Sequence, residues 1–237
     1  HGCAERVLIL RCGEMLAATP PLGWSSWNCC HAAVSHDIVL ANARALVAHG
    51  LDRYGYRHVN VDDGWQGARS PATTIPMALQ GNERFPDLGG LAAGIHDLGL
   101  LAGIYHVHNI HSPQGLAGAT SEHADGTSST PFVHGHGHGM GAHDFIATDC
   151  AQFAAWGFDY LKVDEQPPPD VTARFAAALR ASGRDVILSL SANFPRERIE
   201  QWRPHAQLWR TTGDLIDTWF SLRNKARSQT RWLGVGR

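Results

Sequence analysis

Helix-like and strand-like segments alternate along most of the chain. Residues 35–50 begin on the capping residue Ser35, carry apolar residues at helical spacing and end on Gly50, and a β-branched segment follows at 56–65. The same order then repeats in the pairs 88–99 with 100–106, 144–157 with 158–164, 170–183 with 185–191, and 195–205 with 206–212. Together with an earlier strand at 20–24, this pattern predicts six strands in a parallel sheet with helices between them.

Side chains that can carry chemistry gather where the predicted strands end. They are Trp24, Trp27, Asp62, Asp63, Tyr105, Lys162, Asp164, Arg210 and Asp214. A (β/α)8 barrel brings the carboxyl ends of all its strands to one rim around a single pocket, whereas a doubly wound open sheet spreads them along an edge. No glycine-rich nucleotide-binding motif follows a strand, which disfavours the open sheet. We therefore predict an α/β fold of the TIM (β/α)8-barrel type.

The length of the chain bears on how much of a barrel it holds. Eight βα units typically take about 250 residues. This chain has 237 residues, and its pattern contains only six units. We therefore expect a barrel that is truncated after about six βα units, with the last two strands missing and two edges open.

Overall charge and hydropathy argue against two kinds of partner. The formal net charge is −2, which gives no long-range field to attract phosphate backbones. No segment approaches the roughly 20 apolar residues of a membrane span. We therefore expect neither nucleic acid nor a membrane as partner. No signal peptide is visible, so cytoplasmic and secreted locations both stay open, and the oligomeric state is not predicted.

The cysteines do not form a recognisable framework. There are five of them, Cys3, Cys12, Cys29, Cys30 and Cys150. An odd number without CxxC spacing argues against both a set of disulfides and a zinc site. We expect reduced thiols in the core.

Two of the carboxylates are placed to act together. Asp164 and Asp214 follow strands that lie a short arc apart in a barrel, so they can face each other across a pocket. Glycoside hydrolysis requires such a pair, with one carboxylate as nucleophile and the other as proton donor. Lys162 lies on the same face of its strand as Asp164, and its charge would keep Asp164 ionised. The alternative for any one of these acids is that it caps the following helix.

Aromatic and acidic neighbours fit a sugar as ligand. The aromatic side chains expected on this rim are Trp24, Trp27, Trp65 and Tyr105. Their apolar faces can pack against the C–H groups of a pyranose, and Asp62 and Asp63 can accept hydrogen bonds from vicinal hydroxyls. Capping accounts for single acids, but the gathering of such groups at five of the six strand ends favours a carbohydrate site.

A histidine-rich segment, 133–144, raises the question of a metal. Neutral imidazoles bind divalent metals, and His106, His108 and His111 lie nearby in sequence. Alternating glycine and histidine fixes no geometry, however, and no cysteine or glutamate cluster accompanies it. We expect a solvated loop over the rim and no metal ion or other cofactor.

Five segments in order resemble one known family. They are TPPLGWSSWN at 19–28, VNVDDGWQG at 59–67, GNERFPDLGGLAAGIHDLGLLAGIY at 81–105, AAWGFDYLKVDE at 154–165 and LWRTTGDLIDTW at 208–219. These segments resemble motifs of the α-galactosidase (melibiase) family of glycoside hydrolase clan D, with bacterial members as the nearest type. The resemblance implies that residues 19–237 are a catalytic barrel lacking its last strands, that 1–18 are an N-terminal extension, and that the family's C-terminal β-sandwich is absent.

The resemblance also assigns the catalytic roles. Asp164 matches the family's nucleophile, and Lys162 matches a neighbouring lysine that contacts galactose. Asp214 matches the general acid/base with Arg210 as a sugar ligand beside it, and Asp217 is the substitute if the register of that loop differs. The implied reaction is hydrolysis of terminal α-D-galactosyl residues by double displacement with retained configuration.

Further positions match sugar-binding residues of the family. Asp62 and Asp63 match the pair that holds the 4- and 6-hydroxyls of galactose, Trp27 a pocket wall and Tyr105 a substrate contact. The implied partner is a small molecule or oligosaccharide with a terminal α-galactose.

One position departs from the family pattern. Ser191 and Ala192 stand where many members carry a Cys-Glu pair that contacts the 2-hydroxyl. Small residues there leave α-N-acetylgalactosaminidase or β-L-arabinopyranosidase activity as alternatives. An inactive carbohydrate-binding barrel fragment is a further alternative, because part of the barrel wall is expected to be missing.

Overall fold

The computed structural model describes residues 16–133 and 139–235, and in this part of the chain six strands form one parallel sheet. The strands are β1 (Leu22–Ser25), β2 (Tyr56–Val61), β5 (Leu101–Val107), β8 (Tyr160–Asp164), β9 (Ile187–Leu190) and β10 (Leu208–Trp209). Their spatial order is the same as their order in sequence, β1-β2-β5-β8-β9-β10, and each neighbouring pair is parallel. A barrel wall has this order, whereas a doubly wound sheet reverses direction at a switch point.

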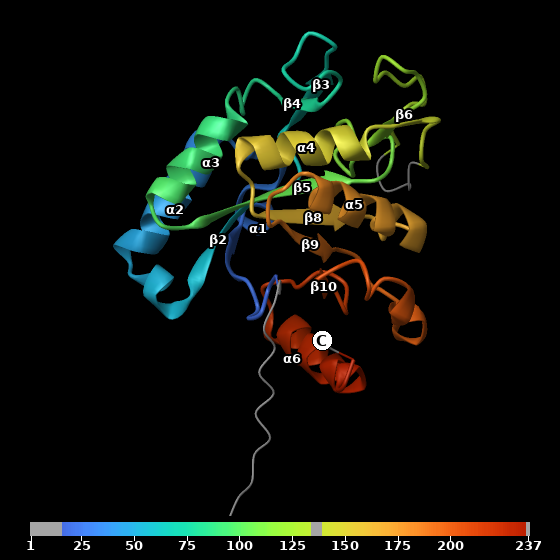
Figure 1. Cartoon of the computed structure of the whole chain (residues 1–237). Helices are drawn as coiled ribbons and strands as arrows, with labels where there is room; N and C mark the ends of the chain where they lie inside the picture. The colour runs from blue at the N-terminus through green and yellow to red at the C-terminus, as the bar shows by residue number, and fades with distance from the viewer. Residues whose placement is uncertain (1–15, 134–138, 236–237) are drawn as a thin grey trace, which may run out of the picture.

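Four longer helices connect the strands and pack next to one another along one side of the curved sheet (Figure 1). They are α2 (His36–Ala48), α3 (Leu88–Asp97), α4 (Ile146–Trp156) and α5 (Pro169–Ala181). Ser35 caps α2 as predicted, because its Oγ accepts a hydrogen bond from the backbone N–H of Ile38 at 3.4 Å. A parallel sheet with helices on its outer side and strands in sequential order is half of a (β/α) barrel, which confirms the predicted fold class.

Other elements complete the described part. A single turn, α1 (Trp27–Cys30), follows β1, and α6 (Trp219–Ser228) lies beyond β10 (Figure 1). The 3₁₀ segments are η1 (His31–Ala33), η2 (Leu51–Tyr54), η3 (Arg196–Gln201) and η4 (Gln229–Trp232). Two antiparallel pairs stand outside the main sheet, β3 (Gln66–Arg69) with β4 (Leu79–Gly81), and β6 (Thr120–Ser121) with β7 (His143–Asp144). None of the helices in these ranges is long and apolar enough to cross a membrane.

One predicted helix takes a different form. Residues 195–205 contain the 3₁₀ segment η3 in place of an α-helix. Pro204 has no N–H to donate and disfavours helical geometry at the residue before it, while Pro195 stands just ahead of the segment. Pro204 therefore prevents the segment from continuing as a helix beyond residue 203.

The strands have two chemically different faces, because successive side chains point to opposite sides. One set is apolar and buried, and belongs to the core cluster with the helices: Val59, Val61, Ala102, Ile104, Leu161, Val163, Leu188 and Leu190. The alternate set carries the polar residues, and the register places Tyr105 beside Lys162 and Lys162 beside Ser189. This alternation turns the functional side chains away from the helices.

A buried ion-pair network joins the outer segments to the sheet. The Asp149 carboxylate in α4 accepts two hydrogen bonds from Arg69, each at 2.6 Å, one from the Leu79 backbone at 2.9 Å, and it lies 2.9 Å from His106 Nε2. Arg69 also donates to the carbonyls of Met77 and Gly118, so all of its charge is compensated inside the protein. Burial alone would raise the pKa of Asp149, but Arg69 and then His106 hold that pKa below its usual range.

Removal of this carboxylate should be costly. We expect Asp149→Ala to lower the free energy of unfolding by about 3 to 5 kcal/mol, because it leaves the guanidinium of Arg69 buried without its counter-charge. Urea unfolding of the variant, compared with Asp97→Ala at an exposed site on α3, measures the loss. A loss below about 1 kcal/mol would show that the network does not hold the fold together.

Candidate active site

A cavity of about 240 Å³ opens at the carboxyl ends of the strands. Its lining residues are Trp27, Asp62, Asp63, Tyr105, Pro113, Lys162, Asp164, Glu165, Ala192, Arg210 and Asp214. They follow or end each of the six strands of the sheet. Eight residues expected from the sequence thus lie around one cavity, and a further one, Ser191, directly precedes a lining residue. Trp24, also expected on this rim, is not among the lining residues and packs, partly buried, against the core.

Lys162 joins two carboxylates at the floor of the cavity. Its Nζ donates to Asp62 Oδ2 at 2.8 Å and lies 3.8 Å from Asp164 Oδ2. Burial alone would lower the pKa of Lys162, but the charges of Asp62 and Asp164 raise it above its usual value. The lysine is therefore a permanent cation that offsets both acids.

Asp164 is held on its other side by the backbone. Its Oδ1 accepts a hydrogen bond from the N–H of Glu165 at 2.9 Å. Glu165 and the next residue, Gln166, have positive φ angles of 64° and 51°. Such angles are uncommon for residues with a side chain and cluster at functional sites. The chain therefore turns sharply just beyond Asp164 and leaves its carboxylate facing the cavity with Lys162.

Hydrogen bonds to backbone and side-chain groups hold the two acids after β2 in place. Asp62 Oδ1 accepts from the N–H of Asp63 at 2.9 Å, and the N–H of Asp62 donates to Ser26 Oγ at 2.9 Å. Trp65 was expected to face the sugar, and this was wrong: its side chain is fully buried in the core and its Nε1 donates to the carbonyl of Tyr105 at 2.9 Å. The indole anchors the turn that carries Asp62 and Asp63 and takes no part in the cavity wall.

Asp63 is a buried acid of the cavity with a raised pKa. Its side chain is almost fully buried, and Gln66 Nε2 and the N–H of Gln114 donate to it at 2.9 and 3.3 Å. Burial, partly offset by hydrogen bonds from Ser112 and Gln66 and reinforced by the charge of Asp62, raises the pKa of Asp63 to about 6. Near neutral pH its carboxyl group exchanges between donor and acceptor forms.

Tyr105 presents a hydroxyl to this group of acids. The residue is 1% exposed, and no protein group within the described residues forms a hydrogen bond with its hydroxyl. Burial, followed by the charges of Asp164 and Asp63, raises the pKa of Tyr105 well above its usual value. The phenol therefore stays protonated and is a hydrogen-bond donor at the cavity.

The opposite wall comes from the loop after β10. Arg210 donates to Asp214, whose side chain is 79% exposed. Asp217, the substitute predicted for the acid/base role, is exposed and is not among the lining residues of the cavity. The structure thus brings Asp164 and Asp214 to the same cavity and leaves Asp217 outside it.

Ser191 lies behind the wall of the cavity. The residue is 5% exposed, its N–H donates to the carbonyl of Val163 at 2.8 Å, and its hydroxyl has no hydrogen-bond partner in the described residues. Its neighbour Ala192 lines the cavity with φ of 94°. Ala192 was expected from the sequence together with Ser191. Sequence reasoning missed Pro113 and Glu165 as lining residues, although an acid directly after Asp164 was a visible signal for Glu165.

Cysteines and histidines depart partly from expectation. Of the cysteines in the described ranges, Cys150 is buried, but Cys29 is exposed and Cys30 is only partly buried, so the prediction of core thiols was wrong for this pair. Residues 134–138 of the histidine-rich segment, with three of its four histidines, lie outside the described residues. Within them, no three His, Cys, Asp or Glu side chains are grouped as metal ligands would be.

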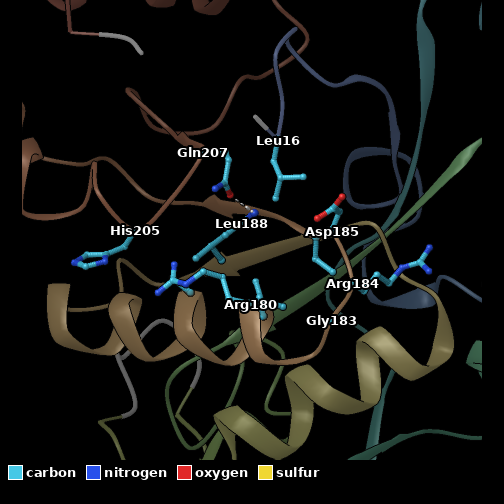
Figure 2. A pocket seen from close by; sticks show the side chains of 11 residues that line it. Leu16, Arg180, Gly183, Arg184, Asp185, Leu188, His205 and Gln207 are labelled. Atoms are coloured by element: carbon cyan, nitrogen blue, oxygen red, sulfur yellow. Dashed lines mark hydrogen bonds between the residues drawn. The ribbon is translucent and has the colours of Figure 1, made fainter. Parts of the chain in front are cut away.

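A second, larger cavity lies at the other end of the strands (Figure 2). It measures about 410 Å³ and lies between α5 and the amino ends of β9 and β10. Gln207 there accepts from the Leu188 N–H at 2.8 Å, and Arg184 pairs with Asp159 at 2.6 Å. In barrels the amino ends of strands serve stability and the carboxyl ends carry the chemistry, so the smaller cavity is the candidate active site.

Comparison with known proteins points to one family. The family model described as "Alpha galactosidase A" matches residues 19–130. An α-galactosidase of Oryza sativa subsp. japonica is 30% identical over 224 residues, which are 92% of this chain and 48% of that protein. The chain is similar to α-galactosidases over nearly its whole length. It spans about half the length of the curated relatives it matches.

Solved structures of the α-galactosidase family superpose on this chain. α-Galactosidase I of Mortierella vinacea is 27% identical with a TM-score of 0.68, over 86% of this chain and 48% of that one. The GH27 β-L-arabinopyranosidase of Geobacillus stearothermophilus, in complex with arabinose, is 27% identical with a TM-score of 0.71, over 91% and 58%. The resemblance seen in the five sequence segments is thus confirmed at the level of the fold.

The buried acid of the site predicts a pH dependence of stability. Because the pKa of Asp63 rises from 3.8 to about 6 on folding, the folded state binds the proton more tightly, and ionisation between pH 4 and 6 costs up to roughly 3 kcal/mol. We expect the free energy of unfolding of Asp63→Asn, relative to the unsubstituted protein, to rise by up to that amount from pH 4 to pH 7. Denaturant titrations at several pH values measure this difference.

A matched variant separates this effect from the mere loss of a charge. Asp97→Asn removes an exposed aspartate at the end of α3 and should leave the pH profile parallel to that of the unsubstituted protein. A profile of Asp63→Asn that is also parallel would contradict the raised pKa.

Proposed function

We propose that this cavity hydrolyses terminal non-reducing α-D-galactosyl residues by double displacement with retention of configuration. The observation that carries the proposal is the meeting of Asp164 and Asp214 at one cavity whose remaining polar lining, Asp62, Asp63, Tyr105, Lys162 and Arg210, is suited to hydroxyl groups. The similarity to α-galactosidases supports the same reaction. The catalytic unit is assigned to residues 19–237 and the segment 1–18 to an extension.

Asp164 is assigned as the nucleophile because a cation and a backbone N–H hold its carboxylate at the cavity. Lys162 lies 3.8 Å from Oδ2, and the N–H of Glu165 donates to Oδ1. Both interactions stabilise negative charge and fix the direction of the carboxylate. Attack on the anomeric carbon forms the glycosyl-enzyme and transfers that negative charge to the leaving oxygen.

Asp214 is assigned as the general acid/base. Its side chain is far more exposed than those of Asp62 and Asp164, and it contacts Arg210. In the first step it protonates the leaving oxygen. In the second step it removes a proton from the water that attacks the anomeric carbon and releases the sugar. An exposed loop position suits this role, because both the leaving group and the incoming water pass on the solvent side.

The other lining residues are assigned to the sugar itself. Asp62 and Asp63 accept hydrogen bonds from the 4- and 6-hydroxyls, with Lys162 between Asp62 and the nucleophile. Tyr105 donates from its hydroxyl, and the indole of Trp27 supplies an apolar wall for the C–H groups of the ring. The ligand class is a small molecule or oligosaccharide with a terminal α-galactose.

Variants of the two acids test the roles. We expect Asp164→Asn to lower kcat on 4-nitrophenyl α-D-galactopyranoside by about 10³-fold or more, because no covalent intermediate forms. Asp214→Ala should lower kcat/KM by about 10² to 10⁴-fold on an oligosaccharide but much less on the aryl galactoside, whose leaving group needs little protonation in the first step. It should lower kcat on both, because hydrolysis of the glycosyl-enzyme loses its base. Initial rates on both substrates measure the split.

Asp217→Ala is the matched control, since it removes an acid three residues away that does not line the cavity. It should keep the activity of the unsubstituted protein. A loss with Asp217→Ala and none with Asp214→Ala would move the acid/base role to Asp217. Unchanged turnover by Asp164→Asn would contradict the proposed mechanism.

A panel of sugars tests the substrate. We expect kcat/KM on the α-galactoside to exceed that on the β-L-arabinopyranoside by about tenfold or more, because the latter lacks the hydroxymethyl group assigned to Asp62 and Asp63. Higher activity on the α-N-acetylgalactosaminide would instead indicate that the small side chain of Ala192 leaves room for the substituent at the 2-position. Galactose binding in calorimetry without turnover of any of the three would select a carbohydrate-binding barrel that is not an enzyme.

A further inference from the structure

Two adjacent thiols lie beside the candidate active site and have no part in the chemistry assigned to it. Cys29 and Cys30 end the single turn α1, and their Sγ atoms are 2.8 Å apart. Cys29 is exposed and Cys30 is partly buried, so reagents in solution reach the pair. We propose that Cys29 and Cys30 form a reversible oxidation site, which a low-molecular-weight disulfide converts to a vicinal disulfide.

The reaction is a thiol–disulfide exchange in two steps. The thiolate of the more exposed Cys29 attacks one sulfur of the small disulfide, which forms a mixed disulfide and releases one small thiol. The thiolate of Cys30 then attacks the Cys29 sulfur and releases the second small thiol. The two protein thiols are oxidised, the small disulfide is reduced to two thiols, and the protons lost by the cysteines are taken up by the released thiolates.

The order of the steps follows from the surroundings of the two sulfurs. Burial, with the hydrogen bond and charge of Cys29 as further causes, raises the pKa of Cys30 to about 11. A thiol with a raised pKa is a poor first nucleophile. It is nevertheless placed to resolve the mixed disulfide, because its sulfur already lies in contact with that of Cys29.

The product would be labile. Neighbouring Cα atoms are about 3.8 Å apart, which is below the roughly 4.4 to 6.8 Å of ordinary disulfides. The eight-membered ring is therefore strained, and strained, exposed disulfides are readily reduced. Such a bond suits a site that is oxidised and reduced repeatedly, because it adds little to the stability of the folded protein.

The pair lies within the structure that holds Trp27 at the cavity. The turn is closed by the N–H of Cys30, which donates to the carbonyl of Ser26 at 3.0 Å, and the rings of Trp27 and His31 meet edge to face at 5.1 Å. Ring closure between residues 29 and 30 changes the backbone between these two aromatic side chains. We expect it to displace Trp27 and weaken sugar binding, a consequence that rests on the proposed function, whereas the oxidation itself does not.

Mass spectrometry tests the oxidation without any assay of activity. The 237-residue chain carrying Cys3→Ser and Cys12→Ser is reduced, freed of reductant and incubated with oxidised glutathione. The tryptic peptide with both cysteines should lose two hydrogens, carry no glutathione, and regain the hydrogens with dithiothreitol. Cys30→Ser should stop at the glutathione adduct, and Cys29→Ser should react far more slowly.

Two results would overturn the oxidation site: an adduct on Cys29 that never resolves, or no change at either residue under conditions that oxidise a free dithiol. The coupling to the cavity is read separately by calorimetry with galactose. Oxidation should raise the Kd about 2- to 10-fold, the size expected for a lost aromatic contact, and the double variant Cys29→Ser/Cys30→Ser should not respond.

The two readouts fail independently. No galactose binding to the reduced protein would count against the proposed function, while the mass result would still decide the oxidation. An unchanged Kd in a fully oxidised sample would refute the coupling alone.

Discussion

The carboxylate of Asp149 is the interaction on which most of this structure depends. It is fully buried and is bound by Arg69, His106 and the backbone of Leu79, which come from β3, β5 and β4. A charge at this depth is tolerated only because every lone pair has a donor. The network therefore fixes three parts of the chain relative to one another: the antiparallel pair β3–β4, the start of α4, and the strand that carries Tyr105. Trp65 packs against His106 and Phe153 beside it, so the acids after β2 are held by the same assembly.

The site is built on rigid strand ends on one side and on a loop on the other. Asp62, Tyr105, Lys162 and Asp164 lie in or directly after hydrogen-bonded strands, and Lys162 donates to Asp62 at 2.8 Å. Asp214 lies in the exposed segment between β10 and α6. A nucleophile must be held at a fixed distance from the anomeric carbon, while an acid that serves two different oxygens in turn gains from freedom to move. The division between a rigid and an open wall is consistent with the roles assigned to the two acids.

Much of this could be predicted from the sequence, for physical reasons that can be named. The alternation of strand and helix patterns located all six strands, and the rule that barrel chemistry lies at carboxyl strand ends located eight of the lining residues. Contacts between distant segments could not be predicted in this way. Trp65 follows the acid pair and looks like a sugar platform, yet the turn at Gly64 carries it into the core. The partial exposure of the Cys29–Cys30 pair depends on α1 being a single turn, which no periodicity in the sequence indicates.

The alternation of β8 has a consequence for how this protein can change over time. Leu161 and Val163 face the helices, and Lys162 and Asp164 face the cavity. A shift of one residue in the pairing of this strand would exchange the two sets. Two charges would then enter the apolar core as two aliphatic side chains entered the cavity. An insertion or deletion in β8 would therefore destabilise the fold, whether or not it also removed activity. The need to fold alone would preserve the spacing of the cavity residues in a related protein that had lost its activity.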